Sequence, residues 1–237
     1  SRATSTTRSA RGSRGAPPIP ELLSVVPDPG LYKRLEGIAM GLALGDFVPQ
    51  ADNLDVAVIF STDRQRIAVL EGDGNGGLTE LAGRGFEVAG EPTIGVAAVP
   101  GRGLDGILVW TATTLELARW QDTRFVISRI LLGRDETRDV ALGDFNGKDG
   151  PDVAVTGSER QIDVLEIDLE GGGFTPITSF PANGRVISLS AANFCDDPEK
   201  LTDLAVLIEH GGTNFLDLYC TPFTAESKPA VTKSLFA

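Results

Sequence analysis

Residues 141–155 read ALGDFNGKDGPDVAV and residues 43–58 read ALGDFVPQADNLDVAV, so the chain contains nearly the same segment twice. Each copy has a run of small apolar residues, an acidic loop rich in turn formers, and a second run in which Val and Ala alternate. Alternation of this kind is typical of a β-strand, and a repeated segment indicates a repeat architecture. The internal repeat therefore decides the fold.

The aspartate that opens the second apolar run sets the repeat length. It occurs at four positions, separated by 50, 47 and 51 residues: Asp55, Asp105, Asp152 and Asp203. A phenylalanine before the loop recurs in three copies, 98 and 49 residues apart: Phe47, Phe145 and Phe194. The second copy, IGVAAVPGRGLDGILVW at 94–110, lacks this phenylalanine.

Each repeat contains four short strand-like runs bounded by Gly, Asp, Asn and Pro, and no stretch has a sustained helical period. Repeats of about 50 residues with four strands are typical of β-propeller blades. We therefore predict an all-β protein, a β-propeller of four-stranded blades with four blades in this chain. The predicted blades cover about 35–90, 91–135, 136–182 and 183–237. Four blades either close a small ring or form part of a ring that further blades complete.

The stretch DFNGKDGPDVAV at 144–155, followed by SERQIDVLEIDLEGGGF at 158–174, resembles the FG-GAP/VCBS repeats. This family forms the propeller of integrin alpha subunits and of many bacterial surface and secreted proteins. The resemblance covers about residues 35–237 and includes EGDGNGGLTE at 71–80, which is similar to the turn between a repeat's third and fourth strands. It implies an extracytoplasmic location (periplasmic, cell-surface or secreted), at a cell surface or as an accessory subunit of an exported complex.

Four polar residues crowd the loop of the third repeat: Asp144, Asn146, Asp149 and Asp152. In the family, a pattern of this type binds calcium, and Ca²⁺ takes six to eight oxygen ligands. This chain departs from the family's pattern because Lys148 occupies the place of the central aspartate. The loop is a candidate calcium site, and the alternative is that Asp and Asn only form turns between strands.

The other loops are weaker metal candidates. The first repeat keeps three carboxylates, but Val-Pro replaces the Asn-Gly of the third: Asp46, Asp52 and Asp55. The fourth repeat is acidic but has a different spacing: Asn193, Asp196, Asp197, Glu199 and Asp203.

Cys195 and Cys220 are the only cysteines. A disulfide between them would contribute about 3 kcal/mol to stability, if its effect is to restrict the unfolded chain. A strand lies between the two cysteines, however, so the alternative is two buried thiols.

His210, the only histidine, precedes two glycines and is expected at an exposed hairpin tip, which argues against a catalytic triad. Trp110 and Trp120 are expected to pack between blades, since they bracket one hairpin. Arg119 is expected to be exposed.

Charge is unevenly distributed. The formal net charge is −12, which argues against nucleic-acid binding, because phosphate recognition needs a basic surface. Residues 1–30 are expected to form an extended tail rich in Ser, Arg, Gly and Pro, and no segment is long enough to span a bilayer. The tail is a candidate partner-binding segment, with a transit peptide as an alternative, because it carries four arginines: Arg2, Arg8, Arg11 and Arg14.

These features together predict a protein-interaction or scaffold module, an accessory subunit of a larger assembly. The predicted partners are proteins, one of which the tail would contact. The alternative is a calcium-dependent carbohydrate-binding or adhesion module, against which the aromatic content of 6% argues. An enzyme would need an acid–base cluster near the propeller axis, and the sequence does not reveal one.

Overall fold

Seventeen short strands make up the part of the chain that the structure describes, and no helix occurs there. The computed structural model describes residues 38–49, 53–61, 66–75, 77–80, 85–89, 93–132, 137–148, 150–157, 160–195 and 201–235. The predicted tail, with Arg2, Arg8, Arg11 and Arg14, lies outside these residues, as do Asp52 and Asp149. The prediction of an all-β protein is confirmed.

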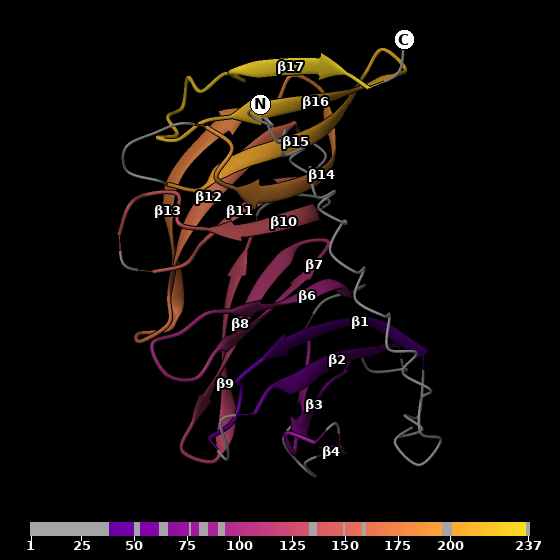
Figure 1. Ribbon diagram of the computed structural model, residues 1–237, viewed down its shortest axis with the longest axis vertical. Helices are drawn as coiled ribbons and strands as arrows, with labels where there is room; N and C mark the ends of the chain where they lie inside the picture. The colour runs from indigo at the N-terminus through magenta and orange to yellow at the C-terminus, as the bar shows by residue number, and fades with distance from the viewer. Residues whose placement is uncertain are drawn as a thin grey trace, which may run out of the picture. The chain divides into compact units, whose positions relative to one another are not determined.

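The strands form four antiparallel sheets, one for each predicted repeat (Figure 1). The first sheet contains β1 (Ile38–Gly45), β2 (Asp55–Ser61), β3 (Arg66–Gly72), β4 (Leu78–Glu80) and β5 (Phe86–Glu87). The second contains β6 (Thr93–Val99), β7 (Gly106–Thr111), β8 (Thr114–Gln121) and β9 (Arg124–Leu131). The third contains β10 (Thr137–Gly143), β11 (Asp152–Gly157), β12 (Gln161–Asp168) and β13 (Gly173–Pro181). The fourth contains β14 (Arg185–Ala192), β15 (Asp203–His210), β16 (Thr213–Tyr219) and β17 (Val231–Ser234).

Strand order within each sheet follows chain order, as short hairpin connections require. The first sheet differs at its outer edge, because β4 and β5 both pair with β3. β5 lies in the predicted outer strand, GFEVAG. β4 follows a turn in which the carboxylate of Asp73 accepts the backbone N–H groups of Asn75 and Gly77, both at 2.8 Å.

Register repeats from sheet to sheet. The last residue of the first strand pairs with the repeat aspartate in three sheets: Gly45 with Asp55, Gly143 with Asp152, and Ala192 with Asp203. Each first strand also has one irregularity near its start. A shared register places equivalent side chains on the same face of every sheet, because successive side chains alternate between faces.

The hydrophobic cores lie between neighbouring sheets. One core joins the first and second sheets, one the second and third, and one the third and fourth. The two tryptophans belong to these cores, Trp120 in the first and Trp110 in the second, so their predicted packing role is confirmed. Burial of apolar area contributes about 25 cal/mol per Å², so these shared cores hold the sheets together.

First strands of successive sheets lie against one another. β1 packs on β6, β6 on β10, and β10 on β14 (Figure 1). The loops after the first strands are joined as well: the Asp105 N–H donates to the Asp46 carbonyl at 2.7 Å, and the Thr202 N–H donates to the Asp144 carbonyl at 2.8 Å. The described sheets therefore form a continuous series with their acidic loops at one end.

Candidate functional site

The repeat aspartates are buried and hold the loop that precedes them. Asp55, Asp152 and Asp203 are at most 2% exposed, and Asp105 is half-buried. Buried carboxylates need hydrogen-bond donors, because an ionised group without partners is costly to remove from water. Asp105 was predicted to be the equivalent residue of the second repeat, and this is wrong, because Gly106 and not Asp105 pairs with the last residue of the first strand there, Val99.

In the first and fourth sheets the carboxylate is fully engaged. Asp55 accepts hydrogen bonds from the N–H groups of Phe47 at 2.9 Å, Val48 at 3.1 Å and Gly72 at 3.3 Å. Asp203 accepts from four donors: Phe194 N–H at 2.8 Å, Cys195 N–H at 2.7 Å, Thr221 N–H at 2.9 Å and the Thr221 hydroxyl at 3.3 Å. Burial alone would raise the pKa of Asp203, but these hydrogen bonds outweigh it and lower the pKa.

The third sheet breaks this pattern. Asp152 is fully buried and accepts the Phe145 N–H at 2.8 Å and the Asn146 side-chain amide at 3.0 Å, and the backbone N–H of Asn146 also acts on it. The residue equivalent to Gly72 and Thr221 is Ile167, and its N–H donates instead to the Pro151 carbonyl at 3.1 Å. Asp152 has therefore lost a donor that its counterparts keep.

The electrostatics of Asp152 follow from that loss. Burial raises the pKa of Asp152 to about 6, and the negative charges of Asp144 and Glu166 add to the rise, while the Phe145 hydrogen bond opposes it. At neutral pH the hydrogen bonds to the ionised carboxylate of Asp152 therefore do not fully offset the cost of burying its charge. A nearby cation would relieve both the burial and the repulsion.

Other parts of this loop are organised around Asp144 and Asn146. Asp144 accepts the Gly147 N–H at 2.7 Å, and the Asn146 side-chain oxygen accepts the Lys148 N–H at 2.7 Å. Gly147 has a positive φ of 72°, which glycine adopts without strain. These are the turn hydrogen bonds that the alternative interpretation predicted, so the loop is an Asx-type turn as well as a candidate metal site.

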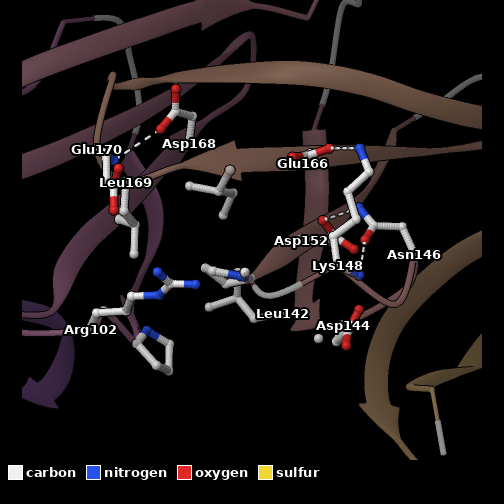
Figure 2. Close-up of a pocket in the computed structure, with 16 residues that line it drawn as sticks. Arg102, Leu142, Asp144, Asn146, Lys148, Asp152, Glu166, Asp168, Leu169 and Glu170 are labelled. Carbon is white, nitrogen blue, oxygen red and sulfur yellow. Dashed lines mark hydrogen bonds and ion pairs between the residues drawn. The ribbon is translucent and has the colours of Figure 1, made fainter. Parts of the chain in front are cut away.

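Lys148 points away from the centre of this loop. Its ammonium pairs with Glu166 at 2.7 Å, and the bond and charge of Glu166 raise its pKa (Figure 2). The lysine side chain is 69% exposed, so this ion pair contributes little to stability. The ammonium of Lys148 therefore neutralises Glu166, and its charge also interacts with that of Asp152.

A cavity of about 820 Å³ opens beside the loop, between the second and third sheets (Figure 2). Its lining includes five acidic residues: Asp144, Asp152, Glu166, Asp168 and Glu170. Two cationic side chains, Arg102 and Lys148, also line it, together with the apolar Leu142, Ile167 and Leu169. The lining of the cavity thus combines an excess of acidic over basic side chains with several apolar ones.

The weaker metal candidates are not assembled in the same way. Asp55 is occupied by three backbone N–H groups, and in the fourth loop Asp203 is occupied by four donors. Asp52, Asp149, Asp196, Asp197 and Glu199 lie outside the described residues. Within the described ranges, the one group of three closely spaced metal-ligand atoms comes from Cys195, Asp203 and Cys220, and its two sulfurs are bonded to each other.

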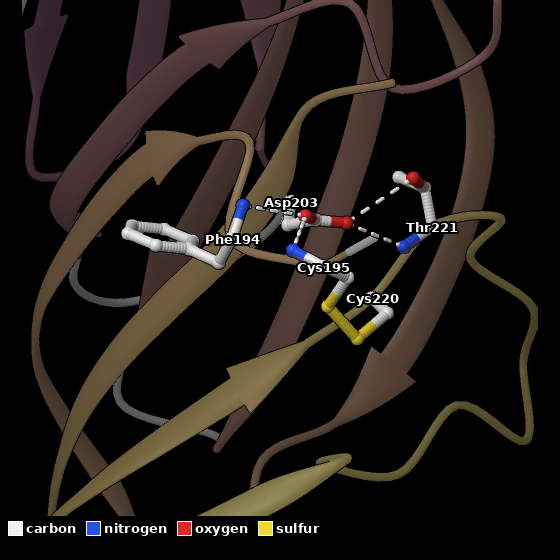
Figure 3. Close-up of a disulfide and its surroundings, with 5 residues drawn as sticks. All are labelled: Phe194, Cys195, Asp203, Cys220 and Thr221. Carbon is white, nitrogen blue, oxygen red and sulfur yellow. Dashed lines mark hydrogen bonds between the residues drawn. A yellow bond between two sulfur atoms is a disulfide. The ribbon is translucent and has the colours of Figure 1, made fainter. Parts of the chain in front are cut away.

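That bond is the disulfide between Cys195 and Cys220, with Cα atoms 5.9 Å apart (Figure 3). The strand β15 lies between the two strands that lead to the cysteines, as the sequence predicted. The bridge forms because both cysteines lie beyond the strand ends, where the loop folds over Asp203. The disulfide and the Asp203 hydrogen bonds therefore hold the same loop.

Arg119 was predicted to be exposed, and this is wrong: it is 8% exposed. Its guanidinium donates to the backbone carbonyls of Leu169 and Glu170, the latter at 2.7 Å, and so ties the second sheet to the β12–β13 turn. The apolar neighbours of Arg119 on β8 were the sequence signal that could have predicted its burial.

His210 lies at an exposed hairpin tip, as predicted, and its ring contacts the Asn183 carbonyl at 3.1 Å.

No protein-family model matches the chain, and no curated protein matches its sequence. The candidate site is therefore defined by its own geometry. One buried carboxylate short of hydrogen-bond donors, a second carboxylate and an amide face a negatively lined cavity.

Proposed function

We propose that this protein is a non-catalytic, extracytoplasmic interaction module built on FG-GAP/VCBS-like propeller blades, with a calcium ion stabilising the third acidic loop. The four stacked sheets supply a rigid scaffold, and their loops supply the contact surface. The proposed role is that of an accessory subunit of a larger assembly.

The observation that carries the calcium proposal is the state of Asp152. Its counterparts in the first and fourth sheets accept a backbone N–H from Gly72 and Thr221, whereas the equivalent N–H of Ile167 donates to Pro151 and the pKa of Asp152 is raised to about 6. Asp144, Asn146 and Asp152 would hold the ion, together with Asp149, which lies outside the described residues. Oxygen ligands of this type suit Ca²⁺, whose charge would replace the missing donors.

The chemistry of the cavity favours a non-catalytic role. Its lining residues in the described part of the chain include no serine, cysteine or histidine, so no nucleophile–base pair is assembled there. The one histidine lies on an exposed tip. A carbohydrate-binding role is the second candidate, favoured by the size of the cavity beside the proposed calcium loop, although none of the described residues that line it is aromatic.

An extracytoplasmic location is supported by the disulfide, because such bonds persist in oxidising compartments. No helix among the described residues is long and apolar enough to cross a membrane. We further propose that the basic tail contacts an acidic protein partner, and deleting residues 1–20 should then release that partner from the purified complex.

Thermal unfolding tests the calcium loop. Calcium should raise the melting temperature, since a ligand present at 100 times its Kd stabilises a protein by about 2.7 kcal/mol. Asp144→Ala should abolish this response. Asp73→Ala, which alters an exposed turn in the first sheet, serves as the matched control and should retain the response. Absence of a calcium response in the unmutated protein would refute the metal site.

Carbohydrate binding is tested separately on a glycan array, with and without chelator. Chelator-sensitive binding to a defined glycan would favour the second candidate. Retention of a protein partner without any glycan binding would favour the interaction module.

A further inference from the structure

The third acidic loop contains a chemically reactive pair of residues, Asn146-Gly147. In an Asn-Gly pair the backbone nitrogen of the glycine can attack the side-chain carbonyl carbon of the asparagine, because glycine has no side chain to hinder the approach. The attack closes a five-membered succinimide ring, and water then opens the ring. The reaction replaces the asparagine amide by a carboxylate, so it changes the charge of the loop.

The nucleophile of this reaction has a base beside it. The Gly147 N–H donates to the carboxylate of Asp144 at 2.7 Å, which is the distance of a charge-assisted hydrogen bond. A backbone nitrogen attacks as it loses its proton, and a carboxylate at hydrogen-bond distance can accept that proton during the attack. Gly147 is exposed, so water can reach the ring that forms.

The electrophile is oriented and polarised by the turn. The side-chain oxygen of Asn146 accepts the Lys148 N–H at 2.7 Å, and its amide nitrogen donates to Asp152 at 3.0 Å (Figure 2). The bond to Lys148 folds the side-chain carbonyl back over the peptide link that follows Asn146, next to the Gly147 nitrogen. The same donor stabilises the negative charge that develops on the oxygen during the attack, as in an oxyanion hole.

A second Asn-Gly pair, Asn183-Gly184, lies just before β14 and lacks these contacts. The Asn183 amide donates to Asp217 at 3.1 Å. Among the described residues, no carboxylate accepts the Gly184 N–H and no backbone N–H donates to the Asn183 side-chain oxygen. The pair at 183 and 184 is therefore an internal control, with the same two residue types in the same molecule.

We propose that the third loop modifies itself, converting Asn146 to aspartate or isoaspartate without an enzyme. Asp144 takes the proton of the Gly147 N–H as the nitrogen bonds to the side-chain carbon of Asn146. The bond between that carbon and the amide nitrogen then breaks, and the amide nitrogen leaves with the proton as ammonia. Water adds to either carbonyl of the ring, so the net reaction consumes water, releases ammonia and involves no oxidation or reduction.

The modification changes the environment of Asp152. It replaces a hydrogen-bond donor 3.0 Å from this buried carboxylate by a second negative charge. Like charges this close repel, so the modified loop is less stable unless a cation lies between them. A calcium ion would gain a further charged oxygen ligand. This consequence rests on the proposed calcium loop, whereas the reaction itself does not.

Peptide mass spectrometry of the full chain, aged in chelator near neutral pH, tests the reaction. Conversion should appear as a mass gain of about 1 Da on the peptide that contains Asn146. In the folded protein Asn146 should convert at least about tenfold faster than Asn183, because a positioned base accelerates proton transfer. In the urea-unfolded chain the two positions should convert at similar rates, since the contacts of the loop are lost.

A variant isolates the role of the base. Asp144→Asn keeps an oxygen that can accept the Gly147 N–H but cannot take its proton, so conversion at Asn146 should slow by at least about tenfold. Asp168→Asn is the matched control, because it makes the same exchange in another turn, where the carboxylate accepts the Gly171 N–H at 2.8 Å. It should leave the rate at Asn146 unchanged. Circular dichroism verifies that both variants are folded.

Three results would overturn the proposal. Asn146 could convert no faster than Asn183 in the folded protein, it could convert more slowly in the folded than in the unfolded chain, or folded Asp144→Asn could retain the full rate. The first two comparisons use the unmutated protein, so they hold even if a variant fails to fold.

The consequence for calcium is measured separately, by thermal unfolding of Asn146→Asp. This variant should have a lower melting temperature than the unmutated protein in chelator and a larger rise on addition of calcium. If neither protein responds to calcium, the calcium loop is refuted, while the mass measurement still decides whether the loop modifies itself.

Discussion

The pH dependence of stability tests the interpretation of Asp152 directly. Burial raises its pKa to about 6 in the folded protein, against an ordinary value of 3.8 for an aspartate. Because the folded-state pKa is the higher one, the folded protein binds more protons in this window, and stability falls as pH rises from about 4 to 6. The total change is about 3 kcal/mol, since each pKa unit corresponds to 1.36 kcal/mol. Between pH 5 and 7.5 the linkage relation gives a change of about 1.4 kcal/mol.

Many carboxylates titrate in this acidic protein, so the measurement is a difference. Urea unfolding of the unmutated protein and of Asp152→Asn is compared at several pH values in chelator. The free-energy difference should shift by about 1.4 kcal/mol in favour of the variant as pH rises from 5 to 7.5. Saturating calcium should remove this shift, because the cation stabilises the ionised carboxylate. A pH-independent difference in chelator, or one of opposite sign, would refute the reasoning about the missing donor.

Three further predictions concern the scaffold. Asp203→Asn should lower the unfolding free energy by more than about 2 kcal/mol at pH 7, because charge-assisted hydrogen bonds are lost. This loss should begin to shrink as pH falls below about 4 and should vanish only below the folded-state pKa, which is lowered, so denaturation at a series of pH values from 7 downward measures it. The double cysteine-to-serine variant should lose about 3.5 kcal/mol in urea unfolding, as expected for a loop closed across 25 residues. Gly95→Ala should lower the melting temperature because its methyl group would overlap the ring of Trp110, whereas Gly103→Ala, which has open space, should not.

The repeat structure could be read from the sequence because it depends on local chemistry. The period-2 pattern in PDVAVTG and TDLAVLI is a property of single strands, and each of these runs is a second strand in the structure. The outer edge of the first sheet was harder to predict. β4 has three residues and no apolar alternation, so only its pairing with β3 reveals it as a strand.

The candidate site was predictable only in part. The crowding of Asp144, Asn146 and Asp152 marked the loop, but all four repeat aspartates look equivalent in the sequence. The difference between Asp152 and the aspartates Asp55 and Asp203 arises from a backbone N–H one residue beyond the pairing partner of Asp152, at Ile167, which no sequence pattern reports. The burial of Arg119 could not be predicted for a similar reason, because the backbone carbonyls that its guanidinium contacts belong to another sheet.

The comparison among the loops suggests why one of them is specialised. Asp55 fastens its loop with backbone donors and Asp203 with backbone donors and the Thr221 hydroxyl, and in the fourth sheet a disulfide reinforces the same loop. In the third sheet the donor of Ile167 is diverted to Pro151, and the loop gives up part of its internal stabilisation. The proposed calcium ion would compensate the charge of Asp152, which is buried away from water. The same loop borders the acidic cavity, so a bound cation would both fasten the loop and neutralise part of the cavity wall, which couples the stability of the scaffold to the surface it presents.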